Sequence, residues 1–294
     1  MTTTLIDFQH ELGGVLIGAQ TLVQIKAIEG LGLPEFRTQD VAPPTEDGLW
    51  LGVDYAQGRT VRIDAAVRAA GDPAAVLDTI ATLQSVADDT TVRLQGGAYT
   101  LLRLKFPGRD VRVVRGRLRK AAAETDRLIH GYAPLDLEFQ ATDHVFYSDD
   151  EQSTSIPLGV IEGGGFTAPV IAPIIVGGTG DSRPGRIDVD GTAPAWPVLT
   201  VNGPCANPRI THVETGRVLE LRTTIPAGQY VVIDTRPTVR TVTRSGGGTL
   251  TLTPASRIDA FSLPAGASEL QWTANDPTNT SSLSVRWAPA WTAL

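Results

Sequence analysis

Residues 185–294 form a series of short apolar runs, each closed by a turn that contains glycine. Residues 198–201 end at Asn202-Gly203, and the runs 210–213 and 218–221 flank the turn Glu214-Thr215-Gly216. Short strands at regular spacing with their own turn residues are typical of an antiparallel β-sandwich. Roughly nine or ten such runs fit a jelly-roll or related sandwich better than a closed barrel. The sequence therefore predicts a C-terminal β-sandwich over residues 185–294.

The length and composition leave room for a second domain with a core of its own. The chain has 294 residues, 41% of them hydrophobic, with 30 glycines and 20 prolines that favour many turns and short strands. Cys205 is the single cysteine, so the chain cannot contain an internal disulfide or a multi-cysteine metal site. We expect Cys205 to be a buried small residue.

Charge and hydropathy exclude several classes of partner. The formal net charge is −7, which argues against specific nucleic-acid binding by bulk charge. The N-terminal stretch carries Asp7, His10 and Glu11 where a secretory signal would be basic and then apolar, and no apolar run is long enough to span a bilayer. We expect no signal peptide and no membrane insertion.

Residues 1–150 are predicted to form a sheet that carries one helix. The helix begins after the N-cap Asp72, has Pro73 at its first position and runs to about Ala87. Val76, Leu77, Ile80 and Leu83 recur at helical spacing and are expected to share its buried stripe. Strands are predicted at residues 21–28, 59–67, 91–94, 99–106, 111–118 and 133–139, with Gln95-Gly96-Gly97 as a hairpin turn between the third and the fourth.

Residues 151–184 are expected to be a linker between the domains because glycine clusters interrupt every regular pattern there. Gly177-Gly178-Thr179-Gly180 lacks the lysine and the following helix of a phosphate loop, so a flexible linker is the better interpretation. The acidic run Asp149-Asp150-Glu151 at its start is interpreted as a solvated charge run.

The sequence predicts no catalytic, cofactor-binding or metal site. It has no nucleophile elbow and no paired metal-binding motif, and its four histidines are isolated from one another. Asp188-Val189-Asp190-Gly191 lacks the later ligands of a calcium loop, so we interpret it as a strand leading into a turn. We predict a structural or binding protein, not an enzyme.

Basic side chains concentrate in residues 93–127 of this acidic chain. Arg112, Arg115, Arg117 and Arg119 are the candidate subunit-interface residues, and the last three share one face of a strand. Such a face can meet a phosphate backbone, but pairing with the acidic surface of a neighbouring subunit fits the acidic domain better. Near the C-terminus, Trp272 and Trp287 are expected in the core, and Trp291 is the candidate for stacking on a glycan ring.

The order of short motifs in the second domain carries a family resemblance. Pro197-Val198-Leu199-Thr200-Val201-Asn202-Gly203 is followed by Asn207-Pro208-Arg209-Ile210, by Gly216-Arg217-Val218-Leu219-Glu220-Leu221, by Ile225-Pro226-Ala227-Gly228 and by Ile233-Asp234-Thr235. Together this series resembles the C-terminal domain of distal tail proteins, the minor tail proteins of siphophages, which have long non-contractile tails. Ala267-Ser268 departs from the family, which often has Asn before the strand there.

The resemblance implies a mainly β fold: a tail-tube-like N-terminal sandwich or split barrel with one helix, and a galectin-like C-terminal sandwich. It further implies a homo-hexameric ring in the virion tail tip, made in the bacterial host cytoplasm. The ring would join the tail tube protein to tail-tip, tail-fibre and receptor-binding proteins, and the genome would be able to pass through it. The alternative is a carbohydrate-binding protein that contacts host cell-surface glycans, including cell-wall glycans; a hydrolase ranks last because no nucleophile or carboxylate pair can be named.

Overall fold

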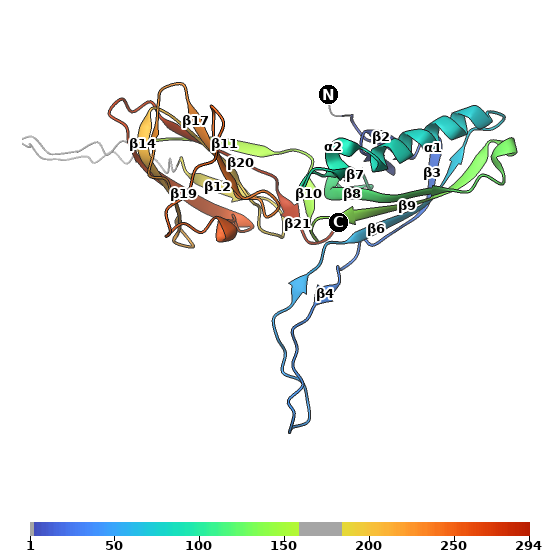
Figure 1. Ribbon diagram of the computed structural model, residues 1–294, viewed down its shortest axis with the longest axis horizontal. Helices are drawn as coiled ribbons and strands as arrows, with labels where there is room; N and C mark the ends of the chain where they lie inside the picture. The colour runs from blue at the N-terminus through green and yellow to red at the C-terminus, as the bar shows by residue number, and fades with distance from the viewer. Residues whose placement is uncertain (1–2, 159–183) are drawn as a thin grey trace, which may run out of the picture. The chain divides into compact units, whose positions relative to one another are not determined.

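The computed structural model describes residues 3–158 and 184–294, which form two compact units (Figure 1). The first unit comprises residues 1–150 and 290–294, and the second comprises residues 151–289. Two boundaries therefore differ from the prediction. Residues 290–294 belong to the first unit and not to the sandwich, and strand β11 (Gln152–Pro157), within the predicted linker, is part of the sandwich. The glycine clusters of residues 163–165 and 177–180 lie outside the described residues.

One large antiparallel sheet forms the first unit, together with two helices. Its main path runs β2-β1-β7-β8-β9-β6-β3, and β10 and β21 extend it beside β8. The strands of this sheet are β1 (Gln9–Leu12), β2 (Val15–Gly18), β3 (Val23–Glu29), β6 (Thr60–Arg68), β7 (Thr100–Leu104), β8 (Arg112–Ala123), β9 (Tyr132–Ala141), β10 (Phe146–Ser148) and β21 (Ala290–Trp291). Strands β2 and β3 are consecutive in the chain but lie at opposite ends of the path, and among the described residues they do not pair.

The alternation of apolar residues along β6 and β9 creates the core face of this sheet. Val61, Ile63 and Val67 are buried, as are Leu135, Leu137 and Phe139 of the neighbouring strand. In the strand predicted at residues 99–106, the alternation of Leu102, Leu104 and Phe106 predicts one buried face; Leu102 and Leu104 are buried, but Phe106 is only partly buried.

Helix α1 (Pro73–Ala87) packs on this face and starts where the sequence predicts. The Asp72 side chain accepts a hydrogen bond from the backbone N–H of Ala75 at 3.0 Å, which satisfies one of the free amides of the first turn. Val76, Ile80 and Leu83 are buried, but Leu77 is 47% exposed because its position turns away from the sheet. The predicted buried stripe is therefore one residue too wide.

The strand predicted at residues 91–94 is wrong. These residues belong to the short helix α2 (Thr90–Arg93), whose first turn is capped by Asp89. The Asp89 carboxylate accepts hydrogen bonds from both the backbone N–H and the hydroxyl of Thr91, at 2.9 and 2.7 Å. A short capped helix and a strand cannot be told apart by apolar periodicity over four residues. The predicted hairpin at Gln95-Gly96-Gly97 therefore does not form, and a short 3₁₀ helix η1 (Leu128–His130) follows later, before β9.

The second unit is the predicted β-sandwich. One sheet has the order β11-β20-β13-β17-β18, and the other has the order β12-β19-β14-β15 with β16 beside β14. The remaining elements are β12 (Arg186–Val189), β13 (Val198–Asn202), β14 (Cys205–His212), β15 (Arg217–Glu220), β16 (Thr224–Ile225), β17 (Tyr230–Asp234), β18 (Thr241–Arg244), η2 (Ile258–Ala260), β19 (Gly266–Asn275) and β20 (Ser282–Trp287). The short apolar runs 250–252 and 261–263 of the predicted sandwich form only isolated bridges, at Leu252 and Leu263.

Side chains from both sheets fill the sandwich core. Trp272 and Trp287 are buried in it, as predicted, and Cys205 is buried there as well. The Trp272 indole N–H donates to the carbonyl of Ile156 at 3.0 Å, so β19 of one sheet is fastened to β11 of the other. No helix in the described part of the chain is long and apolar enough to cross a membrane.

Helix α1 offers a matched test of the first core. We expect Leu83→Ala to lower the free energy of unfolding of the first unit by about 2–5 kcal/mol, because it leaves a cavity against the sheet. Leu77→Ala removes the same atoms from an exposed position and should cost less than about 1 kcal/mol. Urea unfolding followed by far-UV circular dichroism measures both. Equal losses would contradict this packing.

Candidate assembly surfaces

Residues 33–57 form an arm that extends away from the sheet of the first unit (Figure 1). It is a narrow hairpin in which β4 (Phe36–Arg37) pairs with β5 (Tyr55–Ala56), and Val41 makes a single bridge to Trp50 farther out. Asp40 accepts a hydrogen bond from the backbone N–H of Gly52 at 2.8 Å. A two-stranded ribbon without a core is only marginally stable in water. The arm therefore depends on contacts that its own two strands do not supply.

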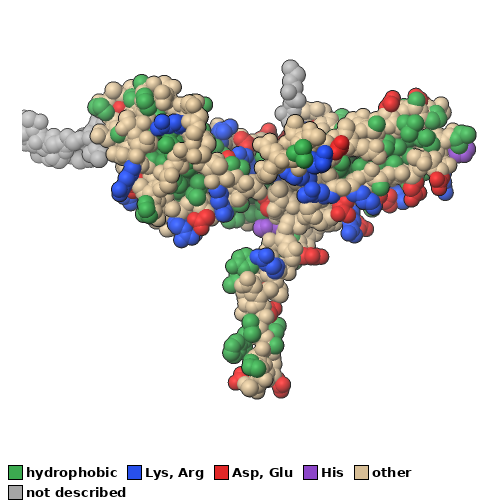
Figure 2. Space-filling view, in the orientation of Figure 1, with side chains coloured by type: hydrophobic (Ala, Val, Ile, Leu, Met, Phe, Trp, Pro, Cys, Tyr) green, Lys and Arg blue, Asp and Glu red, His purple; other side chains and the backbone are tan. Residues whose placement is uncertain are grey.

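Large apolar side chains along the arm are exposed to solvent. Leu51 is 84% exposed and Trp50 is 65% exposed. Figure 2 shows hydrophobic side chains along the arm and acidic side chains near its end. The exposed set is Leu33, Phe36, Val41, Leu49, Trp50, Leu51, Val53 and Tyr55. Concentrated apolar surface of this kind marks an interaction site, because burying it contributes about 25 cal/mol per Å².

Arg59 fixes the root of the arm. Its guanidinium is buried and donates to the carbonyls of Gly30 and Gly32, at 3.3 and 3.2 Å, and to that of His144. It also lies over the ring of Phe146, 4.0 Å from the ring centre. Burial lowers the pKa of Arg59, while nearby Asp143 opposes that shift. One side chain thus holds both the start of the arm and the loop before β10.

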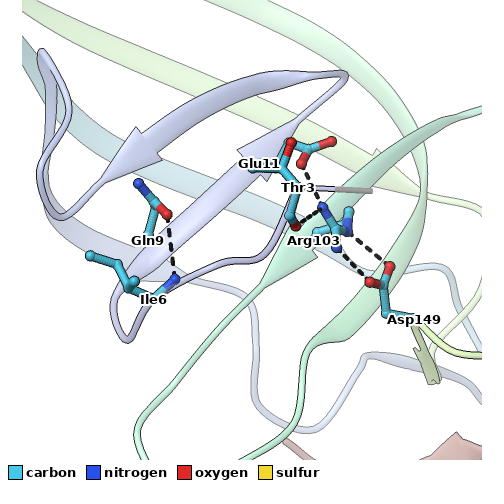
Figure 3. Close-up of polar contacts among 6 residues, drawn as sticks. All are labelled: Thr3, Ile6, Gln9, Glu11, Arg103 and Asp149. Atoms are coloured by element: carbon cyan, nitrogen blue, oxygen red, sulfur yellow. Dashed lines mark hydrogen bonds and ion pairs between the residues drawn. The ribbon is translucent and has the colours of Figure 1, made fainter. Parts of the chain in front are cut away.

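A second buried arginine, Arg103 of β7, joins three parts of the chain (Figure 3). It is 4% exposed and forms a two-pronged ion pair with Asp149, with N–O distances of 2.8 and 2.5 Å. Its remaining nitrogen donates to Glu11 at 2.6 Å and to the carbonyl of Thr3 at 3.1 Å. The hydrogen bond that Arg103 donates to the Asp149 carboxylate is the main reason why the pKa of Arg103 is raised.

The interpretation of Asp149 as part of a solvated charge run is therefore wrong. Its carboxylate fastens the end of β10 to β7, whereas the neighbouring Asp150 is exposed. Sequence reasoning missed this because the partner lies 46 positions earlier in the chain. Only the pairing of strands brings the two groups together.

The four candidate interface arginines of β8 do not share one surface. Arg112 is 6% exposed, and its guanidinium carbon lies 3.4 Å from the centre of the Trp291 ring. Arg115 lies over the ring of Tyr147 at 4.1 Å, and Arg117 donates to three backbone carbonyls between residues 93 and 98. Arg119 is the exposed member of the four. Their role as a subunit interface stays a prediction, and the structure leaves Arg119 the most accessible of them.

Trp291, the candidate glycan-stacking residue, lies in β21 of the first unit and not in the sandwich. Strand β21 pairs with β10, opposite Phe146. Because Arg112 covers one face of the indole ring, at most the other face can meet a sugar. Glycan stacking by Trp291 stays a prediction.

The two histidines that the structure buries have structural surroundings. His10 accepts a hydrogen bond from the backbone N–H of Lys105 at 3.1 Å, and burial lowers its pKa to about 4. His212 lies 2.7 Å from the hydroxyl of Thr215. Within residues 3–158 and 184–294, no group of three or more histidine, cysteine or carboxylate side chains is placed to hold a metal ion.

The family comparison agrees with the second unit. Residues 190–291, about a third of the chain, match the family described as siphovirus-type tail component, C-terminal domain. In this domain the chain is similar to siphovirus-type tail components. Curated protein sequences give no match.

Solved structures extend the likeness to both units. The hub protein Dit of phage SPP1, described as a paradigm of the hub adsorption apparatus in phages that infect Gram-positive bacteria, matches with a TM-score of 0.61 at 12% identity. The match covers 96% of this chain and 98% of that protein. A chain in the baseplate of phage p2, in its calcium-activated conformation, matches with a TM-score of 0.48 at 14% identity, over 95% of this chain and 97% of that one. The likeness to SPP1 Dit shows that the chain has the same fold, and the predicted fold class is confirmed.

Arg59 and Arg62 lie on the same strand and provide a matched pair of substitutions. We expect Arg59→Met to reduce the protection of backbone amides at the root of the arm about tenfold, because it removes three hydrogen bonds from a charged group. Arg62→Met removes only an exposed ion pair to Glu138 at 3.7 Å and should leave that protection unchanged. Hydrogen–deuterium exchange of peptides covering residues 28–36 and 55–60 makes the comparison. Unchanged exchange in both variants would refute the role of Arg59.

Asp149 and Asp150 form a second pair. Asp149→Asn leaves the Arg103 charge buried with half of its ion pair lost, so we expect the first unit to lose about 3 kcal/mol of unfolding free energy. Asp150→Asn should change it by less than about 0.5 kcal/mol. Urea unfolding measures the difference, and a neutral Asp149→Asn would show that the Arg103 contacts do not support the fold.

Proposed function

We propose that this chain is the structural hub of a siphophage tail tip, where six copies form a ring that joins the tail tube to the tail-tip proteins. The observation that carries the proposal is the likeness to SPP1 Dit, which runs through both units and covers nearly all of each chain. A hub acts by geometry and needs no active site. The absence of recognisable catalytic motifs in the sequence is in keeping with that role.

The arm supports ring formation by the first unit. It presents apolar side chains away from its own sheet, and a contact between an arm and a different surface of the next copy is heterologous. Repeated heterologous contacts close into a ring when the rotation between copies allows it. Arg119, exposed on β8, is the arginine that we assign to charge pairing between neighbouring copies.

The sandwich is the part that we assign to contacts with tail-tip, tail-fibre and receptor-binding proteins, while the first unit would contact the tail tube protein. The large side chains of the sandwich, including Trp272 and Trp287, point into its own core. The alternative of glycan binding gains no support from Trp291, because that residue belongs to the first unit and one face of its ring is covered. The protein would be made in the host cytoplasm and act in the virion, and its ring would let the genome pass.

The arm gives a direct test of the ring. We expect the purified chain to form a particle of six times its mass, measured by size-exclusion chromatography with light scattering and seen as rings by electron microscopy. The double variant Trp50→Ser, Leu51→Ser should raise the concentration of half-dissociation at least about tenfold, since it removes apolar surface from the contact.

Leu94→Ser is the control, because Leu94 is 72% exposed in the same unit but lies outside the arm. It should leave the particle intact. A chain that stays monomeric at every concentration would contradict the proposed function.

A further inference from the structure

The sheet of the first unit has an open seam. Strands β2 and β3 end its main path, and within the described residues no strand pairs with the outer edge of either one. An unpaired strand edge presents free backbone N–H and C=O groups, which readily accept another extended chain. An exposed edge therefore runs along β3, over Val23–Glu29.

An apolar groove of about 620 Å³ lies along this seam. The groove is lined by the turn between β2 and β3, by β3 itself, and by Phe8 and Phe106. The β3 side chains that line the groove include Gln24, Ile25, Ala27 and Ile28. Lys26 is the charged side chain of the lining, and its ammonium is paired with Asp64 of β6 at 2.9 Å. Burial lowers the pKa of His10, which is therefore neutral at neutral pH. The groove has no acidic lining residue.

Phe8 indicates that the groove is built for contact. Its backbone φ is +63°, in the left-handed region that costs about 1–2 kcal/mol for a residue with a side chain. Its N–H donates to Lys105 and its carbonyl accepts from Ala19, at 3.0 and 2.9 Å, so the backbone is held there. The result is an aromatic ring that is 57% exposed beside the groove and meets Phe106 edge to face. Such strain at an exposed aromatic residue is typical of a binding surface.

The arm has the complementary chemistry. It is apolar and acidic, with five carboxylates (Glu35, Asp40, Glu46, Asp47 and Asp54) against the single cation Arg37. Residues 51–54, between the Val41–Trp50 bridge and β5, belong to no strand. Figure 1 shows the arm extending away from its own sheet, so these residues lie apart from the groove of their own chain.

From these observations we infer that the open seam along β3 receives the arm of a second copy, which adds an extended segment to the free edge and places apolar side chains in the groove. The inference rests on the proposed ring and assigns the two surfaces that meet in it. The contact would be mainly apolar, with the Phe8 ring covering an apolar arm side chain. Each copy would give one arm and receive one, so that every seam in a closed ring is filled.

Cross-linking between two differently tagged single-cysteine variants tests the inference. Leu51→Cys places a thiol on the arm and Gln24→Cys places one in the groove; the native Cys205 is buried, and burial raises its pKa to about 11, so it reacts little. The two variants are mixed, assembled and treated with a short bismaleimide. We expect a dimer band that carries both tags. Asp78→Cys, exposed on α1, replaces Gln24→Cys as the control and should give at least about tenfold less of that band.

A second pair of variants fills the groove without cysteine chemistry. Ala27→Trp puts a large ring into the groove and should raise the concentration of half-dissociation at least about tenfold. Ala74→Trp, on the exposed side of α1, should leave it unchanged, and circular dichroism checks that both variants are folded.

The outcomes separate the two proposals. Rings that form while the Leu51–Gln24 link is no stronger than the Leu51–Asp78 link overturn the seam inference and leave the hub proposal standing. The seam inference is also overturned if the cross-link forms between two arms or within one chain. It is overturned as well if an apolar ligand still occupies the groove in intact rings. Failure to form any ring overturns both.

Discussion

The first unit depends on a sheet that does not close. Backbone N–H and C=O groups need partners, and a strand edge is stable only when it is paired, covered or short. Here the path begins at β2 and ends at β3, and the free edge of β3 is seven residues long. The helix α1 covers one face of the sheet but not this edge. The long connection from β3 to β6 contains the arm, so an incomplete sheet and a ribbon without a core occur in one unit.

Buried arginines hold this open sheet together at its loops. Arg59, Arg103 and Arg112 are each less than a tenth exposed, and each serves a different junction: the root of the arm, the end of β10, and β21. A guanidinium suits this task because it donates in several directions within one plane and also stacks on aromatic rings. Several basic side chains of the acidic chain therefore make internal contacts. That is why a cluster of basic residues in the sequence became several separate contacts in the structure.

Periodicity predicted most of the architecture, because each strand and helix buries one face. The helix from Pro73 to Ala87 begins and ends as expected from its cap and its apolar stripe. The sandwich could be predicted because turn residues adjoin its strands in the sequence. The predictions that failed concern a short segment and a contact between residues far apart in the sequence. Four residues after α1 form a capped turn of helix and not a strand, and the carboxylate of Asp149 meets an arginine 46 positions away. The arm escaped notice because its apolar residues, such as Trp50 and Leu51, look like core residues until the fold leaves them exposed.

The return of the chain to the first sheet has a topological consequence. Because β21 pairs with β10, the sandwich is enclosed between two adjacent strands of the first unit and is joined to it by two covalent connections, at residues 150–151 and 289–290. The sandwich is thus an insertion in the first unit. An inserted domain can be exchanged for another whose ends lie close together while the host sheet keeps its strand order. A protein with this connectivity can change what its inserted domain binds without changing the sheet that holds that domain.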